Sequence, residues 1–406
     1  MSLVTSVYSV EHRSRKFTAV LRQLLIIRWF KAAIHLILSA ALLQVSPAHA
    51  TTQKTQVIQA IPQTQQDWSF SATLEIDPLN ISGLVVTDHF MALATDEGHQ
   101  IQLFKPLNSN IGEKKTERNA HKIWQPDQLI SLDSSAEALR TELDIEGLTW
   151  QAPYLYAIGS HSVKRAKLKS KHSEQKSLKR LPTVTREPAR HQLFRIQLDA
   201  EHKVVAVEAL SLANLLQAHE TLGLFTAIPS KENGVDIEGL TIDAKGRLLV
   251  GFRGPVLRGN IVTVLQLTLA KKAFKVKSVK TRHLPLEGRG VRGLSRITSM
   301  DPKSIDVDGS PRFLVLAGAV GDQPLSYQVY SWNGETVLFE KQVDQLGAIK
   351  PKPSAVSLHH LCDLPATLGK PEGIAFLQQT ATEIEFVVVQ DGVKNGQPTV
   401  FRCPFN

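Results

Sequence analysis

Short apolar runs, separated by polar stretches that contain glycine, recur along the chain from about residue 80 onward. The run at 248–252 has no polar side chain, which is typical of a strand buried on both faces. The stretch at 193–198 alternates apolar and polar residues instead, like a strand with one face toward solvent. Helical periodicity is confined to 136–142 and 210–218. We therefore expect an all-β protein whose core is built from strands.

An exact repeat organises these runs. The pentapeptide Asp-Ile-Glu-Gly-Leu begins at Asp144 and again at Asp236, and looser copies lie at 81–84, 291–294 and 371–374. Units of several antiparallel strands that repeat with glycine turns are the signature of a β-propeller. The distance between successive copies is uneven, because the central glycines are 54 to 92 residues apart.

The uneven spacing leaves the number of blades open. A propeller blade needs about 40 to 50 residues, so a degenerate extra blade fits at 123–132 or 337–343. We expect a β-propeller of five or six blades, with a β-sandwich that has long loops as the alternative fold.

Residues 1–50 have the order of a secretory signal peptide. A basic leader precedes an apolar run at 32–45, and Pro47-Ala48-His49-Ala50 supplies a small-residue cleavage site. We expect cleavage near Ala50, a periplasmic or secreted protein, and a single propeller domain at 51–406. An uncleaved N-terminal anchor is the alternative.

Export also bears on the two cysteines. Cys362 and Cys403 are the only cysteines of the chain, and a pair in an oxidising compartment is a candidate disulfide. The alternative is two buried thiols that do not pair.

Positive charge is concentrated in one segment. The chain carries a net charge of +9, and ten lysines and arginines lie between Lys164 and Arg190 against two glutamates. This basic segment, at about 164–190, contains no Phe, Trp or Tyr, and its lysines are interspersed with three serines and one glutamine. The composition favours a solvated insertion over a surface that binds nucleic acid.

The repeated turns carry acids that a propeller brings together. Equivalent positions of successive blades face one central channel, so carboxylates far apart in sequence are expected to converge. Ca²⁺ prefers several carboxylate and carbonyl oxygens, so these residues are predicted to bind it: Asp144, Glu146, Asp236, Glu238 and Glu372. Arg292 stands at the equivalent position of the fourth copy, and a structural network of salt bridges in the channel is the alternative.

A second polar set follows the apolar strands. It includes Asp96, Asp322 and Asp391, and it places His161 between two serines as the candidate acid or base. Three arginines are candidates for holding an anionic ligand, because guanidinium groups bind phosphate and carboxylate in a bidentate way: Arg253, Arg258 and Arg292. The chain lacks the short motifs of serine hydrolases, P-loop proteins and zinc proteases.

Several longer segments resemble a known family. The paired pentapeptides and the segments at 246–255, 288–294 and 370–376 resemble the bacterial domain-of-unknown-function 3616 family, over about 81–405. That resemblance implies no established activity. More distantly, the glutamate-glycine turns are similar to exported phytase-like and esterase-like propellers, which implies calcium and phosphate-ester chemistry.

Two functions follow from the sequence. The first is an exported propeller that binds a small anionic ligand or an unknown protein on its rim, with a cation or a salt-bridge network in the channel. The alternative is a cation-dependent periplasmic hydrolase that acts on phosphate esters or other anionic esters. Nucleic acid is not an expected partner of an exported protein.

Overall fold

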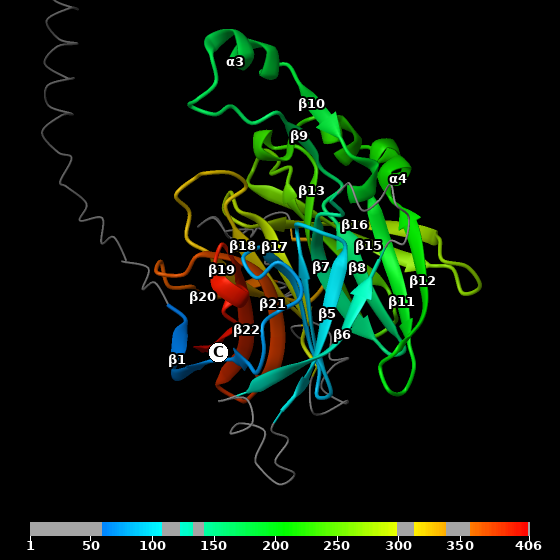
Figure 1. Cartoon of the computed structure of the whole chain (residues 1–406), viewed down its shortest axis with the longest axis vertical. Coiled ribbons are helices and arrows are strands. Elements are labelled where there is room, and N and C mark those ends of the chain that lie inside the picture. Colours follow the sequence, from blue (N-terminus) through cyan, green and yellow to red (C-terminus); the bar gives the residue numbers. More distant parts are fainter. Residues whose placement is uncertain (1–58, 108–121, 133–141, 299–311, 338–357, 405–406) are drawn as a thin grey trace, which may run out of the picture. The chain divides into compact units, whose positions relative to one another are not determined.

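Five sheets, antiparallel apart from one short pairing in the first, account for almost all of the strands in the described residues. The computed structural model describes residues 59–107, 122–132, 142–298, 312–337 and 358–404. Within them the strands form five sheets of four or five strands, plus a two-stranded sheet (Figure 1). The predicted signal peptide, most of the predicted helix at 136–142 and most of the 337–343 segment lie outside the described residues.

Each sheet is one blade, and its strands follow one another from the channel outward. Blade 1 contains β3 (Ile81–Val86), β4 (Met91–Thr95), β5 (Gln100–Pro106) and β6 (Ile123–Ser131), with β2 (Ser69–Phe70) beside β6. Blade 2 contains β7 (Ile145–Gln151), β8 (Tyr154–Gly159), β11 (Gln192–Leu198) and β12 (Val204–Ser211). Blade 3 contains β13 (Asp236–Ile242), β14 (Leu248–Gly254), β15 (Ile261–Leu269) and β16 (Val276–Pro285).

The last two blades follow the same order. Blade 4 contains β17 (Gly290–Arg296), β18 (Phe313–Gly318), β19 (Gln328–Trp332) and β20 (Leu358–Asp363). Blade 5 contains β21 (Lys370–Gln379), β22 (Glu383–Asp391) and β23 (Thr399–Pro404), and β1 (Ile61–Asp67) is its outermost strand. A strand from the start of the described chain therefore completes the blade at its end.

The inner strands close into a ring. β3, β7, β13, β17 and β21 each contact the next in turn, and β21 contacts β3. This closed ring confirms the predicted propeller and fixes its blades at five, and it is incompatible with a β-sandwich. The segment at 123–132, considered above for an extra blade, forms the outer strand β6 of blade 1 instead.

The glycine-leucine pairs of the repeats hold this ring together. At each inner strand, a Cβ atom added to the glycine would lie only 2.8–3.1 Å from the leucine or isoleucine of the next blade. The five pairs run around the ring as Gly83–Leu148, Gly147–Leu240, Gly239–Leu294, Gly293–Ile374 and Gly373–Leu84. Glycine is thus required at each position because the apolar side chain of the neighbouring blade occupies the space of a Cβ atom.

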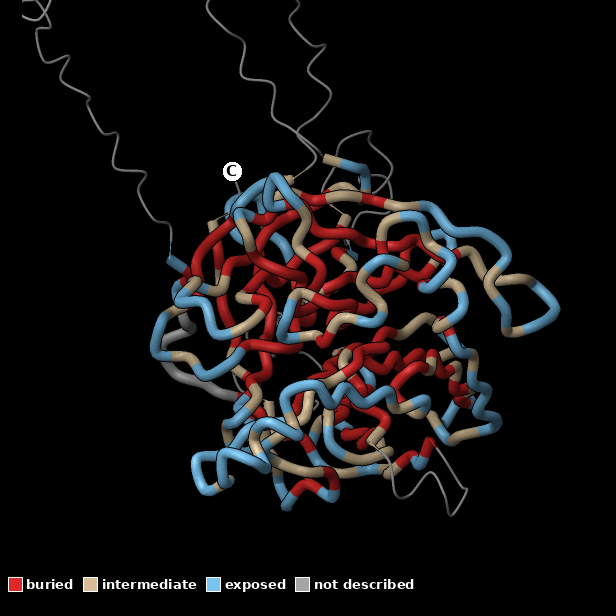
Figure 2. The backbone as a smooth tube through the Cα atoms, turned by 90° about the horizontal axis from the view of Figure 1, so that it is seen from above, coloured by how far each residue is buried: buried red, intermediate tan, exposed pale blue. Residues whose placement is uncertain are grey.

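Buried side chains fill the spaces between blades. Most strand residues are buried, and Figure 2 shows the buried residues in the interior and the exposed residues at the periphery. One apolar cluster joins blades 1 and 2, for example, through residues such as Ile101, Leu148 and Phe194. Long-range packing of this kind makes the blades depend on one another.

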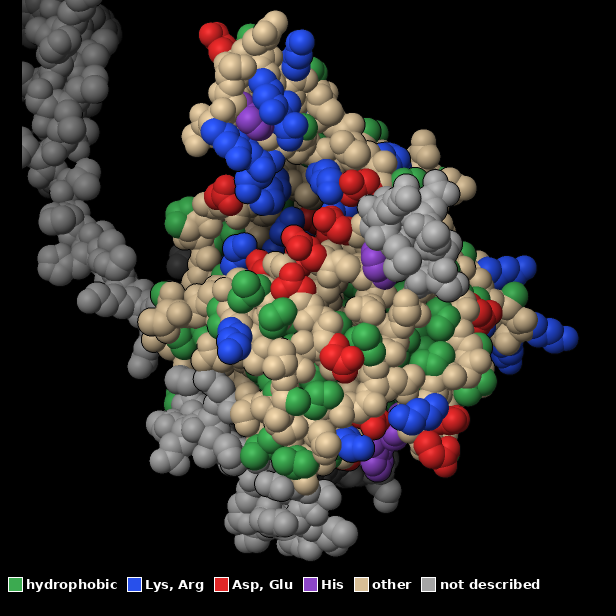
Figure 3. Space-filling view, in the orientation of Figure 1, with side chains coloured by type: hydrophobic (Ala, Val, Ile, Leu, Met, Phe, Trp, Pro, Cys, Tyr) green, Lys and Arg blue, Asp and Glu red, His purple; other side chains and the backbone are tan. Residues whose placement is uncertain are grey.

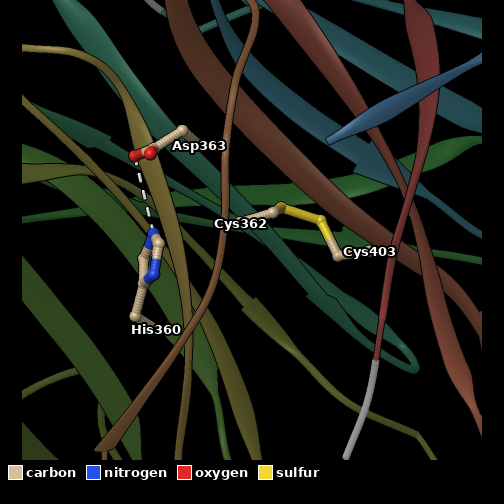
Figure 4. The surroundings of a disulfide bond; sticks show 4 residues. All are labelled: His360, Cys362, Asp363 and Cys403. Atoms are coloured by element: carbon tan, nitrogen blue, oxygen red, sulfur yellow. Dashed lines mark ion pairs between the residues drawn. A yellow bond between two sulfur atoms is a disulfide. The ribbon is translucent and has the colours of Figure 1, made fainter. Parts of the chain in front are cut away.

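A disulfide ties blade 4 to blade 5. Cys362 in β20 is bonded to Cys403 in β23, with Cα atoms 5.9 Å apart, so the predicted pairing is confirmed (Figure 4). Next to this bond, the His360 ring lies 3.5 Å from a carboxylate oxygen of Asp363. The bond anchors the blade that holds both β1 and the last described strand.

The basic insertion has regular structure. It contains β9 (Val163–Arg165), helix α3 (Glu174–Arg180), β10 (Val184–Arg186) and a 3-10 turn at Pro188–Arg190, and it stands out at the top of Figure 1. No residue of α3 is buried, as expected for a solvated insertion. Two polar contacts hold the base of the insertion. Arg165 forms an ion pair with Glu232, and the Arg186 guanidinium donates a hydrogen bond to the Thr226 carbonyl.

In the rest of the described residues the helices are short. Helix α4 (Ala213–Ala218) confirms the predicted helix at 210–218 in its second half, while 204–211 forms β12. Short 3-10 turns lie at Leu222–Phe225, Ser230–Glu232 and Lys394–Gly396. In the described part of the chain, no helix has both the length and the apolar character needed to cross a bilayer.

Candidate functional site

A cavity of about 310 Å³ opens at the end of the channel where the inner strands begin. All five blades and the insertion contribute charged side chains to it, and in Figure 3 acidic side chains gather in a hollow below the basic surface of the insertion. The carboxylates are those of Asp96, Asp144, Glu146, Asp236, Glu238, Asp322, Glu372 and Asp391. The cations are Lys164, Arg190, Lys231, Arg253, Arg292 and Lys370.

The repeat explains why these groups converge. The residue before each repeated glycine occupies the same level of the ring, and around the ring these residues are Ser82, Glu146, Glu238, Arg292 and Glu372. All five predicted metal ligands line the cavity, so the expected convergence is confirmed. Their predicted role as Ca²⁺ ligands stays a prediction. In the described residues, no three Asp, Glu, His or Cys side chains are placed to hold a metal ion as they stand.

Arg292 bridges the acids of the two neighbouring blades. Its guanidinium lies 2.8 Å from a carboxylate oxygen of Glu238 and also donates to Glu372. Only 3 % of its side chain is exposed, so both contacts are shielded from water. This shielding strengthens the pairing, and it also makes the loss of either partner costly.

Arg253 completes the pairing in blade 3. It contacts Asp236 and lies 2.6 Å from Glu238, so Glu238 receives two guanidinium groups. Burial raises the pKa of Glu238 to about 8, and the attraction of the two arginines opposes a further rise. Arg253 and Arg292 are therefore committed to carboxylates rather than open to an anion.

Blade 2 obtains its arginine from the insertion. In the register of the strands, Ser160 occupies the place that Arg253 has in blade 3. The Ser160 hydroxyl donates to Asp144, and Arg190, at the end of the insertion, pairs with the same carboxylate. Burial raises the pKa of Asp144 to about 6 against the opposing effect of Arg190. The insertion thus contributes directly to the cavity wall.

Glu146 and Asp96 are the exceptions. Within the described residues, neither carboxylate has a hydrogen bond or an ion pair, and one oxygen of Asp96 is buried without a partner. Burial raises the pKa of Asp96 to about 8, with Glu372 adding repulsion. Burial also raises the pKa of Glu146 well above its ordinary value, and the nearby Asp144 carboxylate acts in the same direction.

His161 does not lie where the predicted acid or base role requires. It is buried behind the cavity wall, and its Nδ1 atom lies 2.8 Å from the Gly159 carbonyl oxygen. Its ring stacks on His191 with the centroids 5.7 Å apart, and burial lowers its pKa to about 3. The ring is therefore neutral at ordinary pH, and it is not among the residues that line the cavity.

The remaining sequence candidates divide in two. Asp96, Asp322 and Asp391 line the cavity, as the second polar set indicated, whereas Arg258 is exposed and does not. Arg190 was missed as a site residue because it lies at the end of the basic insertion, where it reads as one more solvated charge. Arg190 reaches Asp144 only because the insertion ends next to blade 2, and no local sequence pattern predicts this position.

Comparison with known proteins gives a family. The model of the family described as "Protein of unknown function (DUF3616)" matches residues 80–399. The chain belongs to the DUF3616 family. No curated protein matches it. Among solved structures, it is similar to a PQQ-bound aldose sugar dehydrogenase from Streptomyces coelicolor, at 9% identity and a TM-score of 0.34. That match covers 82% of this chain and 96% of the other.

Proposed function

We propose that this DUF3616 protein is an exported binding protein that holds a small, positively charged ligand in the acidic cavity. The observation that carries the proposal is the Glu146 carboxylate, which borders the cavity and has no partner among the described residues. A partly buried carboxylate without an ion pair is unfavourable, and a ligand cation would offset that cost.

The order of charges around the ring explains why Glu146 is left over. Of its two neighbours at this level, Ser82 donates its hydroxyl to the Ile145 carbonyl, and Glu238 is held by two arginines. Further around the ring, Arg292 forms ion pairs with both Glu238 and Glu372. The acid of blade 2 therefore has no ion pair of its own among the described residues, and Arg253 attracts it only from a greater distance.

The other charges of the cavity support a cation over an anion. Lys164, Arg190 and Lys370 each pair with acids, as do Arg253 and Arg292. Within the described lining only Lys231 has no ion pair, against three acids in the same condition, Asp96, Glu146 and Asp322. An added anion would meet only one lysine without an ion pair, whereas a cation would meet three acidic groups without one.

The size of the cavity favours an organic cation. About 310 Å³ is far more than a bare metal ion fills, and it approaches the lower range of small-molecule pockets. Ca²⁺ remains the competing ligand from the sequence analysis. It would need the acids to rearrange, since they are now held apart by arginines.

Titration calorimetry at constant ionic strength tests the proposal. The probes are spermidine, arginine and, after EDTA treatment, Ca²⁺, each added to the wild type, Glu146→Gln and Glu201→Gln. Removing the carboxyl group that would pair with the ligand is expected to weaken binding of an organic cation about tenfold or more. Glu201→Gln is the matched control, because Glu201 is exposed in the turn between β11 and β12 and does not line the cavity.

The outcomes separate the possibilities. Saturable binding of Ca²⁺ alone would replace the organic cation by a metal ion. Absence of saturable binding by any probe, or equal binding by Glu146→Gln and the wild type, would overturn the proposal. The alternative of a cation-dependent hydrolase stays a prediction, and it would need a proton-transfer group other than His161, which lies outside the cavity.

A further inference from the structure

We propose a second ligand site, on the opposite side of the ring, where a crevice between blades 3 and 4 binds a phosphate, sulfate or carboxylate group. The crevice is lined by the turn after β13, the end of β17 and the start of β18. It is distinct from the acidic cavity. On β17, Arg292 borders the cavity and Arg296 borders the crevice, four residues or about 13 Å further along the strand.

The lining of the crevice has an excess of positive charge. Five cationic side chains face two acids there: Lys245, Arg247, Arg282, Arg296 and Arg312 against Asp243 and Glu335. Each acid already has a partner, since Arg247 lies 2.6 Å from Asp243 and Arg282 pairs with Glu335. The remaining cations are left without a carboxylate.

Arg296 and Arg312 are the two guanidinium groups that the proposal uses. Within the described residues, neither has a side-chain hydrogen bond or an ion pair, and the Nε atom of Arg312 is buried without a partner. Burial lowers the pKa of Arg296, and the nearby Asp243 only partly opposes this. A shielded guanidinium without an anion is unfavourable, so an oxyanion that accepts from both would be stabilised.

The dimensions define the class of ligand. The crevice has a volume of about 50 Å³, which suits one compact oxyanion group and no larger body. Arg296 also borders a depression of about 270 Å³ at this end of the channel, which Trp150 and Phe376 help to line. The ligand is therefore a free small oxyanion, or a larger molecule whose anionic group enters the crevice.

Binding of inorganic phosphate tests the proposal. Calorimetry at constant ionic strength would compare the wild type with Arg296→Gln and Arg312→Gln, and with Lys272→Gln as the control. Lys272 is exposed in the β15–β16 turn of the same blade, so its variant removes one positive charge far from the crevice lining. Acetate and a phosphate monoester with an aromatic body then distinguish a free oxyanion from the head of a larger ligand.

We expect saturable phosphate binding that each arginine variant weakens about tenfold or more and that Lys272→Gln leaves unchanged. Both arginine variants are expected to fold, because neither side chain holds an ion pair within the described residues. Absence of saturable binding would overturn the proposal. So would binding that survives both variants but is lost in Arg253→Gln, because it would place the anion in the acidic cavity.

Discussion

Replacing Asp96 by asparagine should make the protein more stable, and increasingly so as the pH rises. The unfolded chain ionises this carboxyl near its ordinary pKa of 3.8, whereas in the cavity burial and repulsion from Glu372 raise the pKa to about 8. Between these values the folded state holds a proton that the unfolded state has lost. The contribution of Asp96 to stability therefore falls as the pH rises from 4 to 8.

The size of the effect follows from the pKa difference. At pH 7 the cost of Asp96 is at most about 4 kcal/mol, since each pH unit above 3.8 adds about 1.4 kcal/mol. Part of the side chain reaches solvent, so we expect about half of that, about 2 kcal/mol. For a folded unit of about 350 residues this corresponds to a rise in Tm of about 3 °C.

Denaturant unfolding at pH 5, 6, 7 and 8 measures the difference between Asp96→Asn and the wild type. Asp322→Asn is the matched control, because Asp322 borders the same cavity but is exposed, and its removal should leave stability almost unchanged. His161 acts in the opposite direction, since its pKa is lowered to about 3 and stability is lost as the pH falls below 6.5. Taking differences between variants cancels this term. A difference that stays constant with pH, or that Asp322→Asn reproduces, would refute the reasoning.

Two further predictions concern the ring itself. Arg292→Met should cost about 3–5 kcal/mol of unfolding free energy, because Glu238 and Glu372 lose a shared buried partner, while Lys105→Met at an exposed ion pair should cost under about 1 kcal/mol. Equal losses in the two variants would contradict the structural role of the bridge. Gly147→Ala should lower stability by about 1–3 kcal/mol, because the added Cβ meets Leu240 at 2.8 Å and its backbone nitrogen at 3.0 Å. Gly321→Ala, which has no atom nearer than 3.6 Å, should be close to neutral, and thermal unfolding of both variants checks the pair.

The repeat made the fold predictable, and the reason is geometric. Each glycine-leucine pair is a contact between successive blades, so the pattern had to recur once per blade in a closed ring. The copies that begin at Ile81, Val291 and Pro371 therefore mark inner strands, although they match the pentapeptide only loosely. The number of blades was harder to predict because loops and the basic insertion dilute the spacing. The residues proposed for an extra blade at 123–132 have the composition of an outer strand, and only pairing with β5 shows where they belong.

The candidate site was predictable in its members and not in its pairing. The repeat predicted that five acids would lie at one end of the channel, because equivalent positions of the blades share a level. The structure places all five there: Asp144, Glu146, Asp236, Glu238 and Glu372. The sequence could not determine which acids are neutralised, since that depends on side-chain contacts across the channel. Arg253 and Arg292 had been candidates for an anion, and the structure surrounds both with carboxylates.

The departures from the repeat explain where a ligand can act. Five glutamates at one level of the ring would repel one another, and the sequence breaks the repeat at two of the five positions, with Arg292 in blade 4 and Ser82 in blade 1. The arginine removes the repulsion between its two neighbours, whereas the serine removes a charge without supplying one. Glu146 lies beside that serine, so the weakest point of the network is next to blade 1. Asp96, another acid without an ion pair, belongs to blade 1 itself. These two acids without an ion pair therefore gather on one side of the cavity, and a cation bound there would lower their raised pKa values and pair with the carboxylates that form.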